Sequence, residues 1–273
     1  MEPNSFTPHP AGFTFRPGTL DEHAFREVCE TNEYRLPAAF RPDDIIVDVG
    51  MHIGSFCYAA LTRGSTRVHG YEADVSNFER ASRHLRPFSG RVTLNHKAVW
   101  RSDRPATMLK LFADRAGVNT GAGNVVWGVG DQAVEAIPFD DIIRAVTDNG
   151  RERVRLLKID CEGAEFPILL TSRTLHLIDV VVGEYHEFHG DHDEYPMPEA
   201  SRVAGFDRFT IDELGAALRA AGLEVTSSRI GDSHMGMFFA SRNAAATIPA
   251  PHLYPSAGRS WTARARRVLG LSR

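Results

Sequence analysis

Short apolar, β-branched runs that alternate with amphipathic segments constrain this chain more than any other feature of its sequence. Residues 44–50 form such a run and stop at a glycine, and residues 55–61 then indicate the opening of a helix. The same unit recurs along the chain, with further strands predicted at 67–72, 92–99, 154–160 and 180–185 and helices at 76–85, 140–146 and 164–171. Strands that alternate with helices indicate a mostly parallel sheet covered on both faces.

Two Thr-x-x-Glu sequences predict the starts of further helices, because a threonine followed three residues later by a glutamate can form a capping box. The first, Thr19–Glu22, predicts a helix that ends near Glu30. The second, Thr210–Glu213, predicts a helix that ends at Gly222.

Two further segments, one near the C-terminal end of the sheet and one in the middle of the chain, bear on the fold class. Residues 223–229 and 235–242 predict an antiparallel hairpin, and residues 101–132 an insertion of loops and edge strands. We therefore expect a doubly wound α/β fold in three layers, with a mostly parallel seven-stranded sheet. Its predicted parts are an N-terminal helical cap or lid (1–40), the main domain (41–242) and a Pro/Ala linker with a basic tail (243–273).

Composition narrows the class of protein further. The 273 residues are 42% hydrophobic and 24% charged, as in an ordinary globular protein. Neither a secretory leader nor a run of about 20 apolar residues is recognisable, so we expect a cytoplasmic protein that does not bind membranes. The three cysteines, Cys29, Cys57 and Cys161, form no CxxC pair and are expected to be buried thiols.

The formal net charge of −4 averages two unlike parts. Residues 1–241 carry 25 basic and 35 acidic residues, whereas residues 242–273 carry six arginines and no acidic residue. The acidic part would repel phosphates, so nucleic acid is not an expected partner. The basic tail could contact an acidic surface of the same chain or of a second copy, which leaves a homo-oligomer open.

The loop Asp48-Val49-Gly50-Met51-His52-Ile53-Gly54 follows the first predicted strand, where doubly wound sheets bind their ligands. Its glycines let the backbone approach a nucleotide-like ligand, and Glu72 ends the next strand at a position suited to ribose hydroxyls. A dinucleotide needs a glycine where His52 stands, and the Asp48 carboxylate would repel a pyrophosphate. The same carboxylate suits the cationic amino and sulfonium groups of S-adenosylmethionine, which is therefore the favoured cofactor.

A second polar motif, Lys158-Ile159-Asp160-Cys161-Glu162-Gly163-Ala164-Glu165, follows the strand expected beside the first one. Here the chain resembles the FkbM family of S-adenosylmethionine-dependent O-methyltransferases, from about residue 13 to residue 242. The resemblance also rests on Arg16–Asp21, Glu33-Tyr34, the glycine loop, Tyr71–Ala73 and Glu184. Met51-His52, where the family more often resembles Ala-Asn, and the basic tail depart from it.

The resemblance implies a class I methyltransferase fold and a division of the site. Asp48, Gly50 and Gly54 would surround the methionine part of the cofactor, Glu72 would bind the ribose, and Asp160 would face the methyl donor. The end of the third strand would lie near the adenine, and Tyr34 could close over the cofactor as part of the lid. The full set of predicted cofactor-binding residues is Tyr34, Asp48, Gly50, His52, Gly54, Ser55, Phe56, Glu72, Ala73, Ala98, Val99, Asp160 and Glu162.

Methyl transfer to oxygen requires alignment of the reacting atoms and removal of the hydroxyl proton. The predicted catalytic residues, Asp160, Glu184 and His186, follow two strands whose ends face the same crevice. We favour His186 as the base, because an ordinary histidine pKa of about 6.5 suits proton removal near neutral pH. Asp160 and Glu184 would then orient the substrate or the amino group of the cofactor.

The glycine-rich stretch at 116–124 is expected to select the acceptor, so Asn119 and Thr120 join Glu184 and His186 as predicted substrate-binding residues. Residues 187–194 alternate carboxylates and imidazoles, as metal ligands often do. Alternation alone does not make ligands converge, so a solvated acidic loop is favoured there and no metal ligand is predicted, although a divalent metal stays an alternative.

The sequence thus predicts an S-adenosylmethionine-dependent O-methyltransferase that acts on a hydroxyl of a small molecule, such as a sugar or a polyketide-like natural product of secondary metabolism. One alternative is an NAD(P)-dependent oxidoreductase on the same fold. Another is a nucleotide-binding module that has lost its chemistry, against which the carboxylates Asp160, Glu162 and Glu184 argue.

Overall fold

The computed structural model describes residues 12–105, 107–113, 118–188, 197–231 and 233–242. Most of the 187–194 loop and the tail at 243–273 lie outside the described residues, as does the start of the predicted cap. In the part of the chain that the structure describes, no helix is long and apolar enough to cross a membrane.

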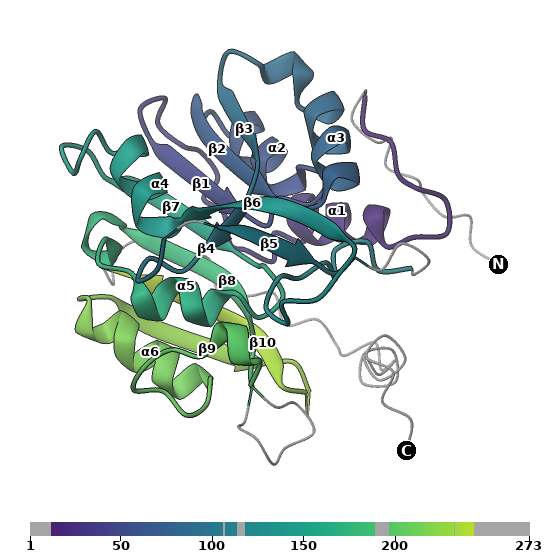
Figure 1. Cartoon of the computed structure of the whole chain (residues 1–273). Helices are drawn as coiled ribbons and strands as arrows, with labels where there is room; N and C mark the ends of the chain where they lie inside the picture. The colour runs from purple at the N-terminus through teal and green to yellow at the C-terminus, as the bar shows by residue number, and fades with distance from the viewer. Residues whose placement is uncertain (1–11, 106, 114–117, 189–196, 232, 243–273) are drawn as a thin grey trace.

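A seven-stranded sheet forms the centre of the molecule (Figure 1). In spatial order its strands are β3 (Val92–His96), β2 (Arg67–Glu72), β1 (Ile45–Val49), β7 (Val154–Ile159), β8 (Val180–His186), β10 (Met235–Ser241) and β9 (Glu224–Arg229). All neighbours are parallel except β10, which is antiparallel to both β8 and β9. The predicted mostly parallel sheet and its closing hairpin are confirmed, and β7 lies beside β1 as expected.

A second, three-stranded sheet contains β4 (Ala98–Trp100), β6 (Gln132–Pro138) and β5 (Met108–Leu111), in that order. The single strand predicted at 92–99 is therefore wrong, because the chain leaves the large sheet at Lys97. The Lys97 side chain faces the small sheet and binds Glu135 at 2.7 Å. Ala98 and Val99 consequently begin β4 and do not end the third strand.

Helices cover both faces of the large sheet (Figure 1). On one face α2 (Ser55–Thr62) and α3 (Val75–His84) pack on the strands, and α1 (Asp21–Cys29) packs on α2. The other face carries α4 (Phe139–Val146), α5 (Glu165–Thr171), α6 (Ile211–Ala220) and the small sheet.

The apolar periodicity of the sequence explains this layering. In β1, Ile45, Val47 and Val49 point into the core shared with α4 and α5, whereas Ile46 points into the core shared with α2. Because both sides of the strand are buried, its sequence is apolar almost throughout rather than alternating.

The two predicted capping boxes have different outcomes. At the start of α6, Thr210 accepts from the Glu213 amide and the Glu213 side chain accepts from the Thr210 amide, as predicted. At the start of α1 the box is absent, and the helix begins at Asp21. There Thr19 donates instead to the carbonyl of Arg16, in the turn that precedes the helix.

Candidate active site

The glycine loop at residues 48–54 turns sharply between β1 and α2. Gly50 has a positive φ of 76°, and a Cβ on it would overlap with the carbonyl oxygen of Asp160 at the end of β7. The amides of Gly50 and Met51 both donate to the carbonyl of Tyr71 at 3.0 Å. Only glycine allows both the conformation and this close approach, so Gly50 joins the ends of β1, β2 and β7 at one point.

His52 adopts a left-handed backbone (φ 52°) that is unfavourable for a residue with a side chain. Its amide donates to Glu72 Oε2 at 2.8 Å, and Glu72 Oε1 accepts from the Asp74 amide at 2.8 Å. Burial raises the pKa of Glu72 to about 7. The structure thus places Glu72, the predicted ribose ligand, directly beside the glycine loop and uses it to hold the loop in shape.

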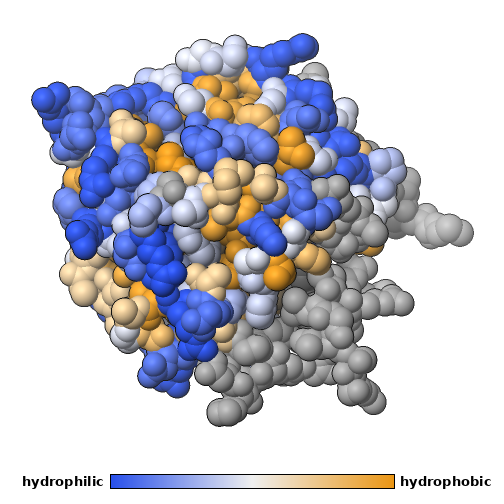
Figure 2. Space-filling view, in the orientation of Figure 1, coloured by the Kyte–Doolittle hydropathy of each residue, from blue (hydrophilic) through white to orange (hydrophobic). Residues whose placement is uncertain are grey.

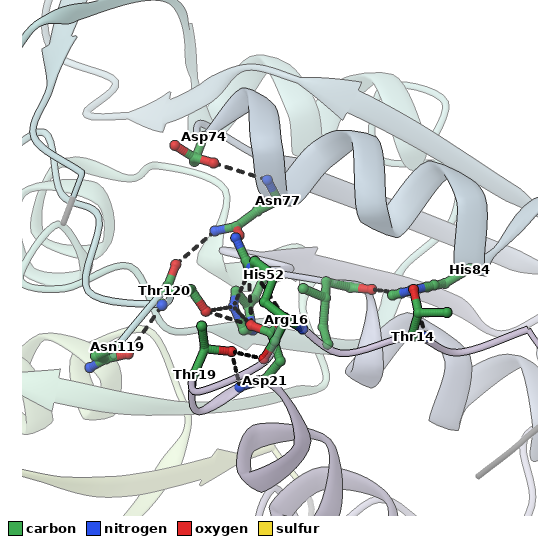
Figure 3. A network of polar contacts seen from close by, with 12 residues as sticks. Thr14, Arg16, Thr19, Asp21, His52, Asp74, Asn77, His84, Asn119 and Thr120 are labelled. Atoms are coloured by element: carbon green, nitrogen blue, oxygen red, sulfur yellow. Dashed lines mark hydrogen bonds and ion pairs between the residues drawn. The ribbon is translucent and has the colours of Figure 1, made fainter. Parts of the chain in front are cut away.

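Asp21 connects three segments that are distant in the sequence (Figure 3). Its carboxylate accepts from Thr120 Oγ1 at 2.6 Å and from Arg16 Nη2 at 2.8 Å, while His52 Nε2 lies 2.8 Å from Thr120 Oγ1. Asn77 completes the network by binding both Arg16 and the carbonyl of Thr120. Burial would raise the pKa of Asp21, but hydrogen bonds from His52, Arg16 and Thr120 lower it well below its usual range.

The N-terminal segment and the insertion therefore meet at the glycine loop. Thr120 lies beside the predicted cofactor loop, and the amide oxygen of Asn119 accepts from the Gly121 amide within its own turn. The acceptor-binding role predicted for both residues stays a prediction.

Asp48 is fully buried, and its carboxylate is paired within the protein. Lys158, its register partner on β7, places Nζ 3.3 Å from Asp48 Oδ1, and Cys57 Sγ donates to the other oxygen at 3.2 Å. Lys158 Nζ also donates to the carbonyl of Gly50 at 2.6 Å. A lysine from the neighbouring strand therefore compensates the charge of Asp48, and the cofactor contact predicted for Asp48 stays a prediction.

The first turn of α2 is suited to an anion. Its leading amides have no partners within the helix, and the buried Oγ of Ser55 has no hydrogen-bond partner among the described residues. The carboxylate of a bound S-adenosylmethionine fits such a site. Phe56 instead packs in the core, edge-on to Tyr34 with ring centres 5.7 Å apart, so its predicted direct contact with the cofactor is not supported.

The carboxyl ends of β7 and β8 and the start of α5 bring four carboxylates and one imidazole together. We call this group the acidic cluster; its members are Asp160, Glu162, Glu165, Glu184 and His186. His186 Nδ1 lies 3.4 Å from Glu165 Oε1, and His186 Nε2 lies 3.5 Å from Glu162 Oε2. The three predicted catalytic residues thus lie in one cluster, and their roles stay predictions.

Burial and mutual repulsion shift the pKa values in this cluster. Burial raises the pKa of Glu162 to about 7 and raises that of Glu184 well above its usual value, opposed in each case by His186. For His186, burial alone would lower the pKa, but Glu165 and Glu162 raise it well above 6.5. The ordinary histidine pKa expected from the sequence therefore does not hold here, because two carboxylates favour the protonated imidazole.

Glu165, which was not assigned to the site from the sequence, and Tyr34, which was, both support the acidic cluster. Glu165 is fully buried and accepts from the amides of Cys161 and Gly163, which shapes the turn that carries Glu162 (φ 55°). From the N-terminal side, the Tyr34 hydroxyl donates to Asp160 Oδ2 at 2.7 Å. Tyr34 is thus buried and held against Asp160, and its predicted role in closing over the cofactor stays a prediction.

Lys158, Arg16 and Asp21 also support the site, and all three belong to the motifs that carry the family resemblance. Lys158 has, in addition, a signal of its own. A lysine inside an apolar strand must find a buried partner. Arg16 and Asp21 gave no such signal, because their partners lie far away along the chain.

Comparison with known families decides the assignment. Residues 48–222, well over half of the chain, match the family model described as the methyltransferase FkbM domain. The chain belongs to the FkbM methyltransferase family. Residues 48–222 are thus a methyltransferase domain of the S-adenosylmethionine-dependent kind, and the NAD(P)-dependent oxidoreductase and the module without chemistry are not favoured.

The solved structures to which this chain is similar are distant. An FkbM methyltransferase from Methylobacillus flagellatus is 14% identical with a TM-score of 0.48, over 78% of this chain and 47% of that one. TrmK from M. capricolum, solved with S-adenosylhomocysteine, is 8% identical with a TM-score of 0.42, over 78% of this chain and 68% of that one. A precorrin-6y C5,15-methyltransferase from Geobacter metallireducens is 13% identical with a TM-score of 0.41, over 85% of this chain and 94% of that one. This chain thus spans about half of the Methylobacillus protein, and no curated protein matches it.

The insertion at residues 101–132, which contacts the glycine loop through Thr120, exposes apolar side chains. Of the five large hydrophobic side chains exposed among the described residues, three belong to the insertion: Met108, Val118 and Val129. Figure 2 shows hydrophobic surface over this part of the molecule, in the orientation of Figure 1. The carbonyl of Val118 accepts from the Leu20 amide at 2.9 Å, which fixes this surface to the N-terminal segment.

Proposed function

We propose that this FkbM methyltransferase transfers the methyl group of S-adenosylmethionine to a hydroxyl oxygen of a small molecule, a sugar or a polyketide-like product of secondary metabolism. The observation that carries this proposal is the acidic cluster. A hydroxyl acceptor must lose its proton, and the cluster places proton-accepting groups beside Asp160, whose backbone contacts the glycine loop.

Hydrogen-bond donors of the protein would bind the carboxylate of the cofactor, and carboxylates of the protein would bind its hydroxyls and its positive groups. The first turn of α2, with Ser55, would bind the carboxylate, and Glu72 would accept from the ribose hydroxyls. Asp160 and Glu162 would attract the positive ammonium and sulfonium groups. The assignment of the adenine to Ala98 and Val99 stays a prediction, with both residues now placed on β4. The cofactor contact predicted for Ala73 also stays a prediction.

The chemistry divides between the cofactor and the protein. When bound, S-adenosylmethionine supplies a methyl group whose bond to sulfur breaks while a bond to the acceptor oxygen forms, and the sulfur keeps the electron pair. The protein aligns the acceptor oxygen and receives the proton of the hydroxyl on the acidic cluster. The apolar surface of the insertion would contact the carbon skeleton of the acceptor.

Product analysis tests this proposal. The enzyme is incubated with methyl-labelled S-adenosylmethionine and a panel of sugars, aminosugars and polyketide alcohols. We expect the label on an oxygen, identified by mass spectrometry and by the NMR shift of the new methyl group. Label found only on nitrogen, carbon or nucleic acid would contradict O-methylation.

Binding of S-adenosylhomocysteine should depend on pH through Glu72. Its pKa of about 7 in the folded protein is above the ordinary value, and ribose hydroxyls donate best to the ionised carboxylate. Affinity should therefore be nearly full at pH 8, about half of that at pH 7 and about tenfold lower at pH 6. Calorimetry at pH 6 and pH 8 measures this; Glu72→Gln should bind weakly at both, and an unchanged slope in that variant would assign the pH dependence to another group.

A further inference from the structure

Three members of the acidic cluster converge from different segments. Asp160 follows β7, Glu165 begins α5 and His186 ends β8. One potential ligand atom from each lies within 4.8 Å of those from the other two. We propose that Asp160, Glu165 and His186 bind a divalent cation such as Mn²⁺ at the centre of the methyltransferase site.

The imidazole supports this proposal independently of the carboxylates. Both ring nitrogens of His186 are buried, and neither has a hydrogen-bond partner among the described residues. Buried polar atoms are normally paired, and the nearest carboxylate oxygens are too distant for good hydrogen bonds. Coordination of a cation would pair one of these nitrogens, and imidazole with carboxylate oxygens is a suitable ligand set for Mn²⁺ and neighbouring metals.

The negative charge of the acidic cluster also favours a bound cation. Four carboxylates lie together, and the nearest lysine, Lys158, is 3.9 Å from Asp160 Oδ2 but is already bound to Asp48 and to the carbonyl of Gly50. Carboxylates withdrawn from water need a compensating positive charge. One proton on His186 is the remaining positive charge in the cluster. A divalent cation that displaces this proton would offset more of the excess negative charge that Lys158 leaves.

The supporting contacts hold the proposed ligands in place. The Cys161 and Gly163 amides fix the Glu165 carboxylate, and the Tyr34 hydroxyl holds one oxygen of Asp160. Such outer contacts orient metal ligands in proteins.

The coordination positions that the protein leaves open on the proposed cation indicate a class of substrate. Three protein ligands leave positions for oxygens of the acceptor, and a bound cation makes a coordinated hydroxyl more acidic. This step rests on the proposed O-methylation. It favours acceptors with two adjacent oxygens, such as a vicinal diol, and leaves Glu184 to receive the proton.

Direct metal binding tests the site. The full-length protein is stripped with EDTA, dialysed and titrated with Mn²⁺, and free Mn²⁺ is measured by EPR. We expect one Mn²⁺ per chain, with the affinity lowered at least tenfold in Asp160→Asn and in His186→Gln. Two controls should bind like the wild type: Glu199→Gln, whose carboxylate is 91% exposed, and Asp191→Asn/Asp193→Asn in the acidic loop of the sequence.

The outcomes separate the cation from the proposed function. Melting temperature and S-adenosylhomocysteine affinity are measured in the same metal-free samples, so that a folding defect is recognised; Glu165→Gln is used only if it folds. Absence of Mn²⁺ binding in the wild type, equal binding in the ligand variants, or loss of binding in the loop control would each overturn the site. None of these results concerns methyl transfer, whereas absence of S-adenosylhomocysteine binding would count against the proposed function itself.

Discussion

Replacing His186 with alanine should lower kcat by about 100-fold or more, while the affinity for S-adenosylhomocysteine changes little. Positioned groups that assist proton transfer contribute about 100- to 10,000-fold to a rate. His186 is the only cationic partner that Glu162 and Glu165 have in the ion pairs of the described residues, so its loss removes the group that organises the acidic cluster. The cofactor contacts proposed for Ser55 and Glu72 do not involve it.

His176→Ala is the matched control, because this histidine is exposed and its Nδ1 contacts the carbonyl of Arg173. Single-turnover rates and calorimetry should show normal cofactor affinity and normal turnover in the control. If His186→Ala kept the wild-type kcat with a normal melting temperature, the imidazole would have no part in the reaction. A parallel loss of cofactor affinity and melting temperature would instead indicate a structural role.

The fold was predictable because its causes are local. The β-branched run before Gly50 and the apolar spacing of the helices depend on neighbours in the sequence, and these elements lie where they were expected. The prediction of a single strand at 92–99 was wrong because the cause of the break is not local. Its residues are all compatible with a strand, and only the Lys97–Glu135 contact, made with a distant segment, shows where one sheet ends and the other begins.

The candidate site was predictable as a place but not as a set of contacts. Strand ends gather at one edge of a parallel sheet, so the position of Glu72, Asp160 and His186 followed from the topology. The partner of each side chain did not. His52 departs from the family pattern, and its contact with Thr120 joins residues 68 positions apart, which no local pattern reveals.

Replacing Lys158 with methionine should lower the free energy of unfolding by about 3–5 kcal/mol, the cost of leaving one member of a buried ion pair alone. Asp48 is fully buried, and besides Lys158 its carboxylate contacts the weak thiol donor of Cys57. Thermal unfolding followed by circular dichroism measures the change. A melting temperature lowered by about 5–9 °C is expected for a chain of this size.

Lys97→Met is the matched control, because Lys97 also forms an ion pair at 2.7 Å but does so at the surface, with Glu135 63% exposed. Exposed pairs contribute about 0–1 kcal/mol, so the control should remain close to the wild type. Equal effects of the two lysine substitutions would contradict the importance of burial at Lys158.

The double variant Asp48→Asn/Lys158→Met separates the ion pair from the second contact of Lys158. If the cost arises from an uncompensated carboxylate, the double variant should be less destabilised than the sum of the two single variants. Lys158→Met and the double variant should both bind S-adenosylhomocysteine more weakly than the wild type, because both lose the hydrogen bond from Lys158 to the Gly50 carbonyl. Recovery of affinity together with stability would show that Lys158 acts only through Asp48 and does not hold the glycine loop.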